Sequence, residues 1–139
     1  MRQIRLTAVL LLLATAAFAQ SPKLMLFGGS DHDVYLGCLN CNSFASDSVC
    51  NEFGQHGSEF ASDSIWNEFG RFGSEFSSDS PWNAFGTNAP IIVDADGNFY
   101  GYFSRNEFHL KRTRIKALVA PLNLAGQLKL AGLQKAFCK

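Results

Sequence analysis

A tandem repeat of 16 residues is the feature of this sequence that most limits how it can fold. Three copies begin at Phe44, Phe60 and Phe76, and the third breaks off at Gly86. Each complete copy holds two glycines, which excludes a long helix because an interior glycine costs about 1 kcal/mol. Units this short cannot bury an apolar face alone, so we expect each to pack its aromatic residues on the next.

The residue types inside one unit predict a short coil. The Ser-Asp-Ser segment supplies side-chain oxygens that can cap the amides of a turn. Residues 65–69 are expected to make about one helical turn, which Gly70 ends. Gly73 is then expected to reverse the chain into an extended segment at 74–76.

One aligned column of the repeat holds Cys50, Trp66 and Trp82. We expect both tryptophans, and the two phenylalanine columns that begin at Phe44 and Phe53, to be stacked core residues, because aromatic side chains dominate the packing of a small domain. The alternative is that the tryptophan and phenylalanine columns face solvent and stack on sugar rings or on a partner protein. The cysteine favours the core, since it could not replace a sugar-stacking ring.

A second column places a carboxylate at the same position of each copy, and its members are Asp47, Asp63 and Asp79. Stacked units would align these groups, which could then bind a hard cation or cap backbone amides. We favour caps, so no metal site is predicted here.

Two segments that flank the repeat, 23–39 and 90–103, are predicted β-hairpins. The second turns at Asp94-Ala-Asp-Gly, which lacks the twelfth-position glutamate of a calcium loop and is interpreted as a plain hairpin turn. Residues 35–44 resemble residues 99–108, 64 positions later. We therefore expect one antiparallel sheet in which strands 34–39 and 98–103 occupy related or neighbouring positions.

The four cysteines have an even count, which in an exported chain indicates two disulfides; they are Cys38, Cys41, Cys50 and Cys138. The pair Cys41–Cys50 is our first choice, and Cys38–Cys50 follows closely. The Cys-x-x-Cys spacing at 38–41 could also belong to a redox pair or half of a zinc site.

The chain after the second hairpin becomes basic and then rich in Leu and Ala. Four cations, Lys111, Arg112, Arg114 and Lys116, are expected on the solvated face of a short helix rather than on nucleic acid. A final helix is predicted over 124–137, with Asn123 as its cap and Cys138 holding the chain end. The predicted fold class is therefore α+β.

The N-terminus has the pattern of a removable signal peptide at residues 1–19, with Arg2 and Arg5 before an apolar stretch and Ala17-Phe-Ala before the expected cleavage. The mature chain would begin at Gln20 as one small domain, 20–139, without a membrane span. Its 10 basic and 12 acidic residues give a net charge of about −2. The expected location is secreted or periplasmic.

Motifs for metalloprotease, serine hydrolase and phosphate-loop chemistry are absent from the sequence. A Cys–His nucleophile remains possible by composition, but disulfide formation would normally consume the thiols. We expect His32, His56 and His109 to be turn or surface residues. No catalytic residue and no cofactor is predicted.

Three segments carry a resemblance to a family of uncharacterised exported bacterial proteins. They are YLGCL at 35–39, SDSIWNEFGRFGSEF at 62–76 and PIIVDADGNFYGY at 90–102. The family has Tyr at many positions where this chain has Phe. The resemblance implies a secreted bacterial protein and transfers no catalytic residue.

The predicted function is a non-enzymatic interaction or structural module that meets a protein or polymer of the cell envelope. The alternative is a hydrolase of extracellular polymers or its accessory domain.

Overall fold

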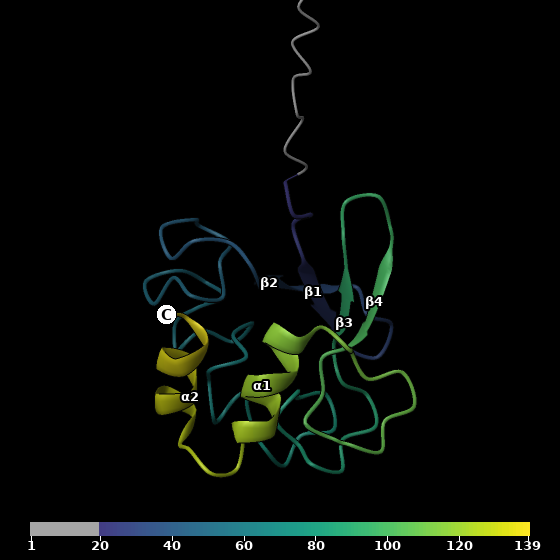
Figure 1. The fold of residues 1–139 in the computed structure, drawn as a ribbon. Coiled ribbons are helices and arrows are strands. Elements are labelled where there is room, and N and C mark those ends of the chain that lie inside the picture. The colour runs from purple at the N-terminus through teal and green to yellow at the C-terminus, as the bar shows by residue number, and fades with distance from the viewer. Residues whose placement is uncertain (1–19) are drawn as a thin grey trace, which may run out of the picture.

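The computed structural model describes residues 20–139. It contains four short strands, a long region without helix or strand, and two helices near the C-terminus (Figure 1). The predicted signal peptide lies outside the described residues.

The four strands form one antiparallel sheet in the order β2-β1-β3-β4. Their bounds are β1 Met25–Gly28, β2 Val34–Cys38, β3 Ile91–Val93 and β4 Phe99–Tyr102. The expected α+β class and antiparallel sheet are confirmed. The two hairpins join through β1 and β3, so the expectation that 34–39 and 98–103 could be neighbours is wrong. Leu26 pairs with Ile92 at the centre, where both side chains are fully buried, and this leaves the second strand of each hairpin at an edge.

The two edge strands do occupy related positions. Cys38 and Tyr102, which are 64 residues apart, each make a pair of backbone hydrogen bonds to a later segment. The bonds run from Cys38 N to Asp47 O, Val49 N to Cys38 O, Tyr102 N to Lys111 O and Thr113 N to Tyr102 O. The preceding residues, Gly37 and Gly101, have φ of 115° and 98°, and a Cβ on either would lie within 3.0 Å of a carbonyl oxygen of the facing segment. Only glycine fits there.

Most of the chain between the hairpins is a run of β-turns in which one turn ends where the next begins. In each turn, the amide of residue i+3 donates to the carbonyl of residue i, and the residue that donates in one turn accepts in the next. Within one unit these bonds link, in order, Ser58, Ala61, Ser64, Asn67 and Gly70, and a final bond over four residues links Gly70 to Ser74. Four steps of three and one of four give the spacing of 16. The expected helical turn at 65–69 and extended segment at 74–76 are wrong, because these residues lie in turns.

Two glycines of the repeat are fixed by the close approach of successive turns. A Cβ on Gly57 would lie 2.0 Å from the carbonyl oxygen of Asn51, and one on Gly73 would lie 2.0 Å from that of Asn67. Backbone atoms cannot yield as a flexible side chain would. A side chain at either position is therefore excluded.

Two helices, α1 (Lys116–Leu124) and α2 (Leu130–Phe137), replace the single helix predicted over 124–137. Asn123 lies inside α1 and caps nothing; its Oδ1 accepts a hydrogen bond from Arg112 at 2.9 Å. The chain breaks between the helices at Gly126, which has φ of 91° and abuts the guanidinium of Arg105. Neither helix, nor any other in the described part, is long and apolar enough to cross a membrane.

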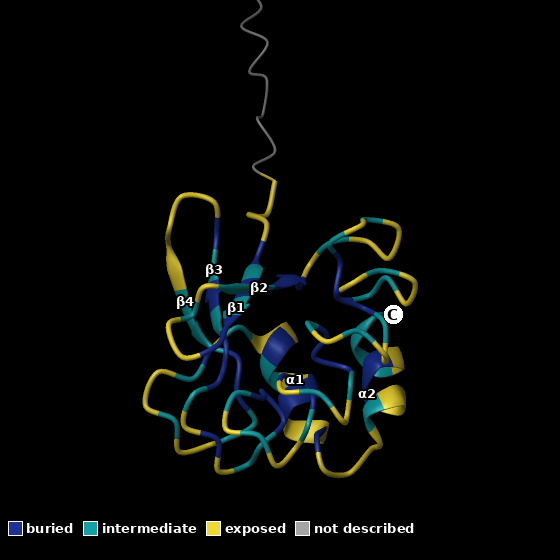
Figure 2. Ribbon diagram, turned by 180° about the vertical axis from the view of Figure 1, so that it is seen from behind, coloured by how far each residue is buried: buried dark blue, intermediate teal, exposed yellow. Residues whose placement is uncertain are grey.

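The core lies where one side of the sheet, the turns and the two helices meet (Figure 2). The turn region contributes Val49, Ile65, Trp66, Phe72 and Trp82 to it. The tips of the turns face solvent. This division between interior and tips places the candidate site.

Candidate functional site: a row of phenylalanine turns

Seven phenylalanines occupy the third position of a four-residue β-turn; they are Phe44, Phe53, Phe60, Phe69, Phe76, Phe85 and Phe108. In each turn, the amide of the fourth residue bonds to the carbonyl of the first at 2.9–3.4 Å. We call these segments the phenylalanine turns.

A side-chain oxygen fixes each phenylalanine turn. The first residue is Asn in five turns and Ser in two, and its side chain accepts a hydrogen bond from the phenylalanine amide at 2.9–3.2 Å. Asn and Ser favour turns because they can mimic a backbone acceptor in this way. The Asn residues of the repeat also donate from Nδ2 to a carbonyl six residues earlier, as Asn67 does to Ala61 at 3.2 Å. The backbone of each tip is therefore held in place without help from the phenyl ring.

The phenyl rings themselves lie in solvent, so the expected packing of the phenylalanine columns in the core is wrong. Their residues are 84–99% exposed, and Leu110 nearby is 98% exposed. An exposed apolar residue is ordinary when it stands alone, but a contiguous apolar surface marks an interaction site. Five of the seven rings follow a glutamate, so the surface combines apolar and acidic groups.

The tryptophans take the opposite orientation, as expected for core residues. Trp66 and Trp82 are 2% and 3% exposed. Their Nε1 groups donate to the carbonyl oxygens of Val49 and Ile65, each in the preceding unit, at 2.6 Å and 2.5 Å. Phe137 packs on Trp66, with ring centroids 5.9 Å apart. The tryptophan column is therefore unavailable as a binding face, whereas the phenylalanine columns are open.

A groove separates the phenylalanine turns from the C-terminal helices. Its central part has a volume of about 770 Å³ and continues at each end into a part of about 370 Å³. One wall is built from five of the turns, with Phe60, Phe69, Phe76, Phe85 and Phe108. The other wall comes from residues 122–133, which include the connection between α1 and α2. We call this feature the aromatic groove.

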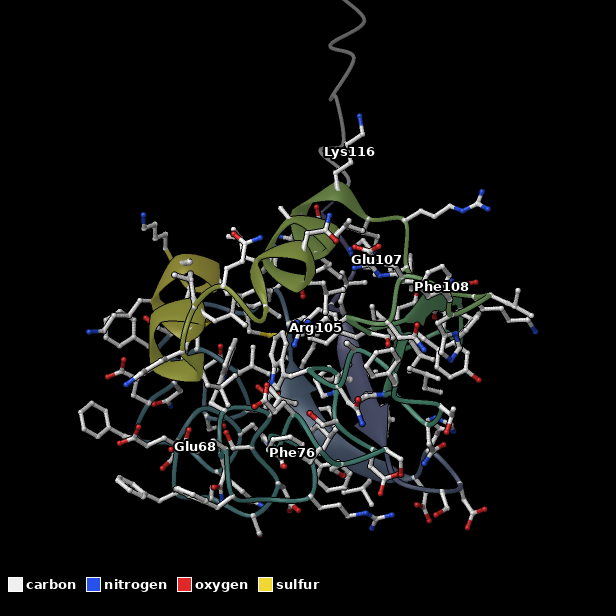
Figure 3. All side chains as sticks on the ribbon, turned by 90° about the horizontal axis from the view of Figure 1, so that it is seen from below. Glu68, Phe76, Arg105, Glu107, Phe108 and Lys116 are labelled. Carbon is white, nitrogen blue, oxygen red and sulfur yellow. A yellow bond between two sulfur atoms is a disulfide. The ribbon has the colours of Figure 1, made fainter. Side chains whose placement is uncertain are left out.

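The charges on the aromatic groove are mostly acidic. Four glutamates, Glu59, Glu68, Glu75 and Glu107, line it together with two cations, Arg105 and Lys129. Figure 3 shows Arg105 between Glu68 and Phe76 on one side and Glu107 and Phe108 on the other. Arg105 lies 3.4 Å from the carbonyl of Trp82 through its Nη1, so a backbone contact positions it. Sequence reasoning missed this arginine as a site residue, because nothing in its own segment places it opposite the repeat.

The three repeat aspartates do not cap backbone amides, contrary to the expectation. The caps are the serines that follow them: Ser64 Oγ accepts from the Trp66 amide at 3.1 Å, and Ser80 does the same for Trp82. Each aspartate instead accepts from a side chain. Asp47 accepts from Lys23 and Tyr35, Asp63 from Gln55, and Asp79 from Arg71 and Asn88.

Hydrogen bonds from neighbouring side chains lower the pKa of two of the repeat aspartates, Asp47 and Asp79. A hydrogen bond from Lys23 and another from Tyr35 lower the pKa of Asp47, and burial raises the pKa of Tyr35 well above its usual value. Burial acts to raise the pKa of Asp79, but hydrogen bonds from Arg71 and Asn88 outweigh it, so the pKa is lowered. The three aspartates are separate, and no group of acidic, His or Cys side chains in the described residues could hold a metal ion.

Asp94 organises the turn of the second hairpin. Its carboxylate accepts from the amides of Asp96 and Asn98, from the Asn98 side chain and from the Tyr100 hydroxyl, all at 2.7–3.0 Å. The Asn98 side chain is the main cause that lowers the pKa of Asp94 to about 2, and Tyr100 is the next. Because both carboxylate oxygens accept hydrogen bonds from within the hairpin, Asp94 stabilises the turn.

None of the three histidines lines the aromatic groove. His56 is buried against Tyr35 with ring centroids 5.0 Å apart, and His32 contacts the carbonyl of Ala89 at 3.1 Å. His109 stacks on Tyr102 at 4.2 Å, and burial lowers its pKa. His56 lies in a turn, as expected, but it is buried rather than on the surface and occupies the same repeat column as the buried Phe72.

All four cysteines form disulfides, but the pairs are Cys38–Cys41 and Cys50–Cys138. The expected pairings of Cys50 with Cys41 or Cys38 are wrong. The reason lies in the packing of α2, which covers the first unit where Cys50 replaces a tryptophan. Gln134 of α2 donates to the carbonyl of Gly57 at 2.7 Å, and this contact holds the chain end beside Cys50. The Cys-x-x-Cys pair closes its own short loop.

Neither protein-family models nor curated proteins nor solved structures give a match to this chain.

Proposed function

We propose that this protein is an exported, non-enzymatic interaction module of the bacterial cell envelope, and that the phenylalanine turns form its contact surface. The observation that carries the proposal is the exposure of seven phenyl rings in turns whose backbone is fixed by polar side chains. The two disulfides support maturation in an oxidising compartment.

The energetics of the tips favour a role in binding over a role in folding. Leaving a phenylalanine in water forgoes about 1.5–3 kcal/mol of burial. The same turn could be made with a polar residue at the third position, because the hydrogen bonds come from Asn or Ser and from the backbone. Seven apolar rings at such positions gain nothing for the isolated chain, whereas a rigid aromatic array supplies contact area at low entropic cost to a partner.

The hydrolase alternative finds less support in the titrating groups. A general acid needs a raised pKa to hold its proton near neutral pH. The shifted aspartates, Asp47, Asp79 and Asp94, all have lowered pKa values and accept hydrogen bonds from neighbouring side chains. They are suited to holding turns together.

The test is sedimentation with envelope preparations, at a protein concentration of about 10 nM so that association between copies contributes nothing. The variant is Phe69→Ser combined with Phe76→Ser, and the control is Phe99→Ser, which changes a half-exposed phenylalanine on β4. We expect the wild type and the control to sediment with the envelopes and the double variant to lose at least about 10-fold in affinity. Equal sedimentation of the double variant and the wild type would contradict the proposal, as would a wild type that stays in solution. Release of soluble fragments from the envelopes would indicate the hydrolase instead.

A further inference from the structure

The aromatic groove has a complementary surface elsewhere on the same molecule. Residues 109–112 form a β-turn, closed by a hydrogen bond from the Arg112 amide to the His109 carbonyl at 3.1 Å. The expected short helix that presents the four cations is therefore wrong, since only Lys116 lies in a helix. Leu110 and Lys111 occupy its tip, and Leu110 is 98% exposed. Arg114 and Lys116 follow, both exposed. We call residues 109–116 the basic turn.

The basic turn is held rigidly. Arg112 donates from Nε to the carbonyl of Ser104 at 2.7 Å and from Nη2 to Asn123 at 2.9 Å. The flanking residues, Lys111 and Thr113, bond to Tyr102 on the edge strand β4. A fixed tip loses little conformational entropy when it binds. Lys111, Arg114 and Lys116 make no ion pair with any residue from 20 to 139.

Acidic and basic side chains are concentrated in different regions of the chain. Residues 42–88 carry seven acidic side chains and one basic, whereas residues 105–139 carry eight basic and one acidic. A nearly neutral protein thus has an acidic turn region and a basic C-terminal region. Opposite patches of this kind steer association and suppress contacts of like charge.

We infer that the occupant of the aromatic groove is a second copy of this chain, whose basic turn inserts between the phenylalanine turns. The inference rests on the proposed function and adds a second copy of this chain as a partner of that surface, beside the envelope component that the surface binds when the protein is dilute. Leu110 would pack among the phenyl rings, while Lys111, Arg114 and Lys116 would meet Glu59, Glu68 and Glu75. An apolar and cationic protrusion fits an apolar and acidic groove.

The relative position of the two surfaces sets the form of the assembly. The basic turn begins one residue after Phe108, at one end of the aromatic groove, and Figure 3 shows Lys116 beyond Glu107 at the edge of that face. A groove and a protrusion on different parts of the molecule make a head-to-tail contact. Such contacts generate open chains or rings rather than closed two-fold dimers. The assembly should therefore grow past the dimer as the concentration rises.

The test is sedimentation velocity of the exported, oxidised protein over a range of concentrations, at low salt and at about 0.5 M salt, where surface charges are screened. Two variants each reverse one surface: Lys111→Glu with Arg114→Glu, and Glu68→Lys with Glu75→Lys. Lys135→Glu reverses an exposed cation of α2 outside the basic turn and serves as the control. Unchanged tryptophan fluorescence would show that each variant is folded.

We expect the wild type and the control to associate at low salt and to dissociate at high salt. Each double variant alone should associate at least about 10-fold more weakly, and an equal mixture of the two should restore association, because each groove then meets a turn of opposite charge. A wild type that stays monomeric, variants that associate as well as the wild type, or a mixture that fails to associate would overturn the inference. Any of these results together with retained envelope binding would leave the proposed function standing, so the two failures are distinguishable.

Discussion

Trp66 and Trp82 stack with their ring centroids 5.3 Å apart and their planes inclined by 27°. This contact joins the second and third copies of the repeat, and the indole nitrogens extend it because each donates to a carbonyl of the preceding unit. A ring buried on both faces with its N–H satisfied is a stable core element. The first copy has Cys50 at the equivalent position and a disulfide to Cys138 in place of the stack. The interior of the turn region is therefore continuous from the first unit to the third.

Both tryptophans of the chain lie in this stack, so intrinsic fluorescence reports on it alone. We expect a blue-shifted emission maximum and little quenching by acrylamide, because both rings are excluded from water. Emission at the position of free tryptophan, with full quenching, would mean that the rings face solvent. The measurement needs no variant and can be repeated in denaturant as the reference.

Two glycine-to-alanine substitutions should change the free energy of unfolding in opposite directions, because one glycine is tightly packed against backbone and the other is not. Gly73→Ala would place a Cβ 2.0 Å from the backbone of Asn67, and we expect it to lower the free energy of unfolding by at least about 2 kcal/mol. Gly132→Ala, in α2, meets nothing closer than 4.0 Å and should raise the free energy of unfolding by about 0.5–1 kcal/mol. Urea unfolding of both variants measures whether each substitution lowers or raises the free energy of unfolding. Equal effects would contradict the stacked arrangement of the turns.

The two disulfides should differ in their contribution to stability. Cys50–Cys138 closes a loop with a sequence separation of 88, whereas Cys38–Cys41 closes one of 3. The chain-entropy relation gives about 4–5 kcal/mol for the long loop and about 2 kcal/mol for the short one. Replacing each pair by serine and measuring thermal unfolding tests the order. Peptide mapping without reductant provides the control, and a Cys41–Cys50 peptide would contradict the observed pairing.

Acid should weaken the second hairpin through Asp94. Its pKa is lowered to about 2 in the folded state, so the unfolded chain takes up the proton first as the pH falls. The contribution of Asp94 is thus fully present above about pH 4–5 and is lost as the pH falls toward 2. Asp94→Asn should be less stable than the wild type at pH 7, and the difference should shrink between pH 4 and pH 2. A difference that does not change with pH would argue against an ionised Asp94 in the turn.

The sequence predicted the classes of element better than their contacts. The hairpin at 90–103 follows from Asp-Gly between β-rich runs, and the 64-residue similarity anticipated the matching bonds of Cys38 and Tyr102. The burial of the tryptophans could be argued from the cysteine in their column. The disulfide pairing could not, because it depends on where α2 packs, and the break at Gly126 depends on Arg105, which lies 21 residues earlier.

The sequence does contain a pattern that distinguishes the exposed phenylalanines from the buried tryptophans. The phenylalanines follow Asn-x or Ser-x, and three of them precede a glycine, a pattern typical of the third position of a turn. Turn tips lie on the surface, so the pattern indicates solvent exposure. Apolar character alone suggested burial instead. Residue type alone was also misleading for the repeat aspartates, because the neighbouring serines cap the backbone amides.

The most direct test of the division between a tryptophan core and a phenylalanine surface compares two alanine variants of the same unit, Trp66→Ala and Phe69→Ala, by urea unfolding. We expect Trp66→Ala to lower the free energy of unfolding by about 3–5 kcal/mol, as for a buried large aromatic residue. Phe69→Ala should change it by no more than about 0.5 kcal/mol, because the ring is 91% exposed. Losses of similar size in the two variants would show that the phenylalanine turns belong to the core and would contradict their role as a contact surface.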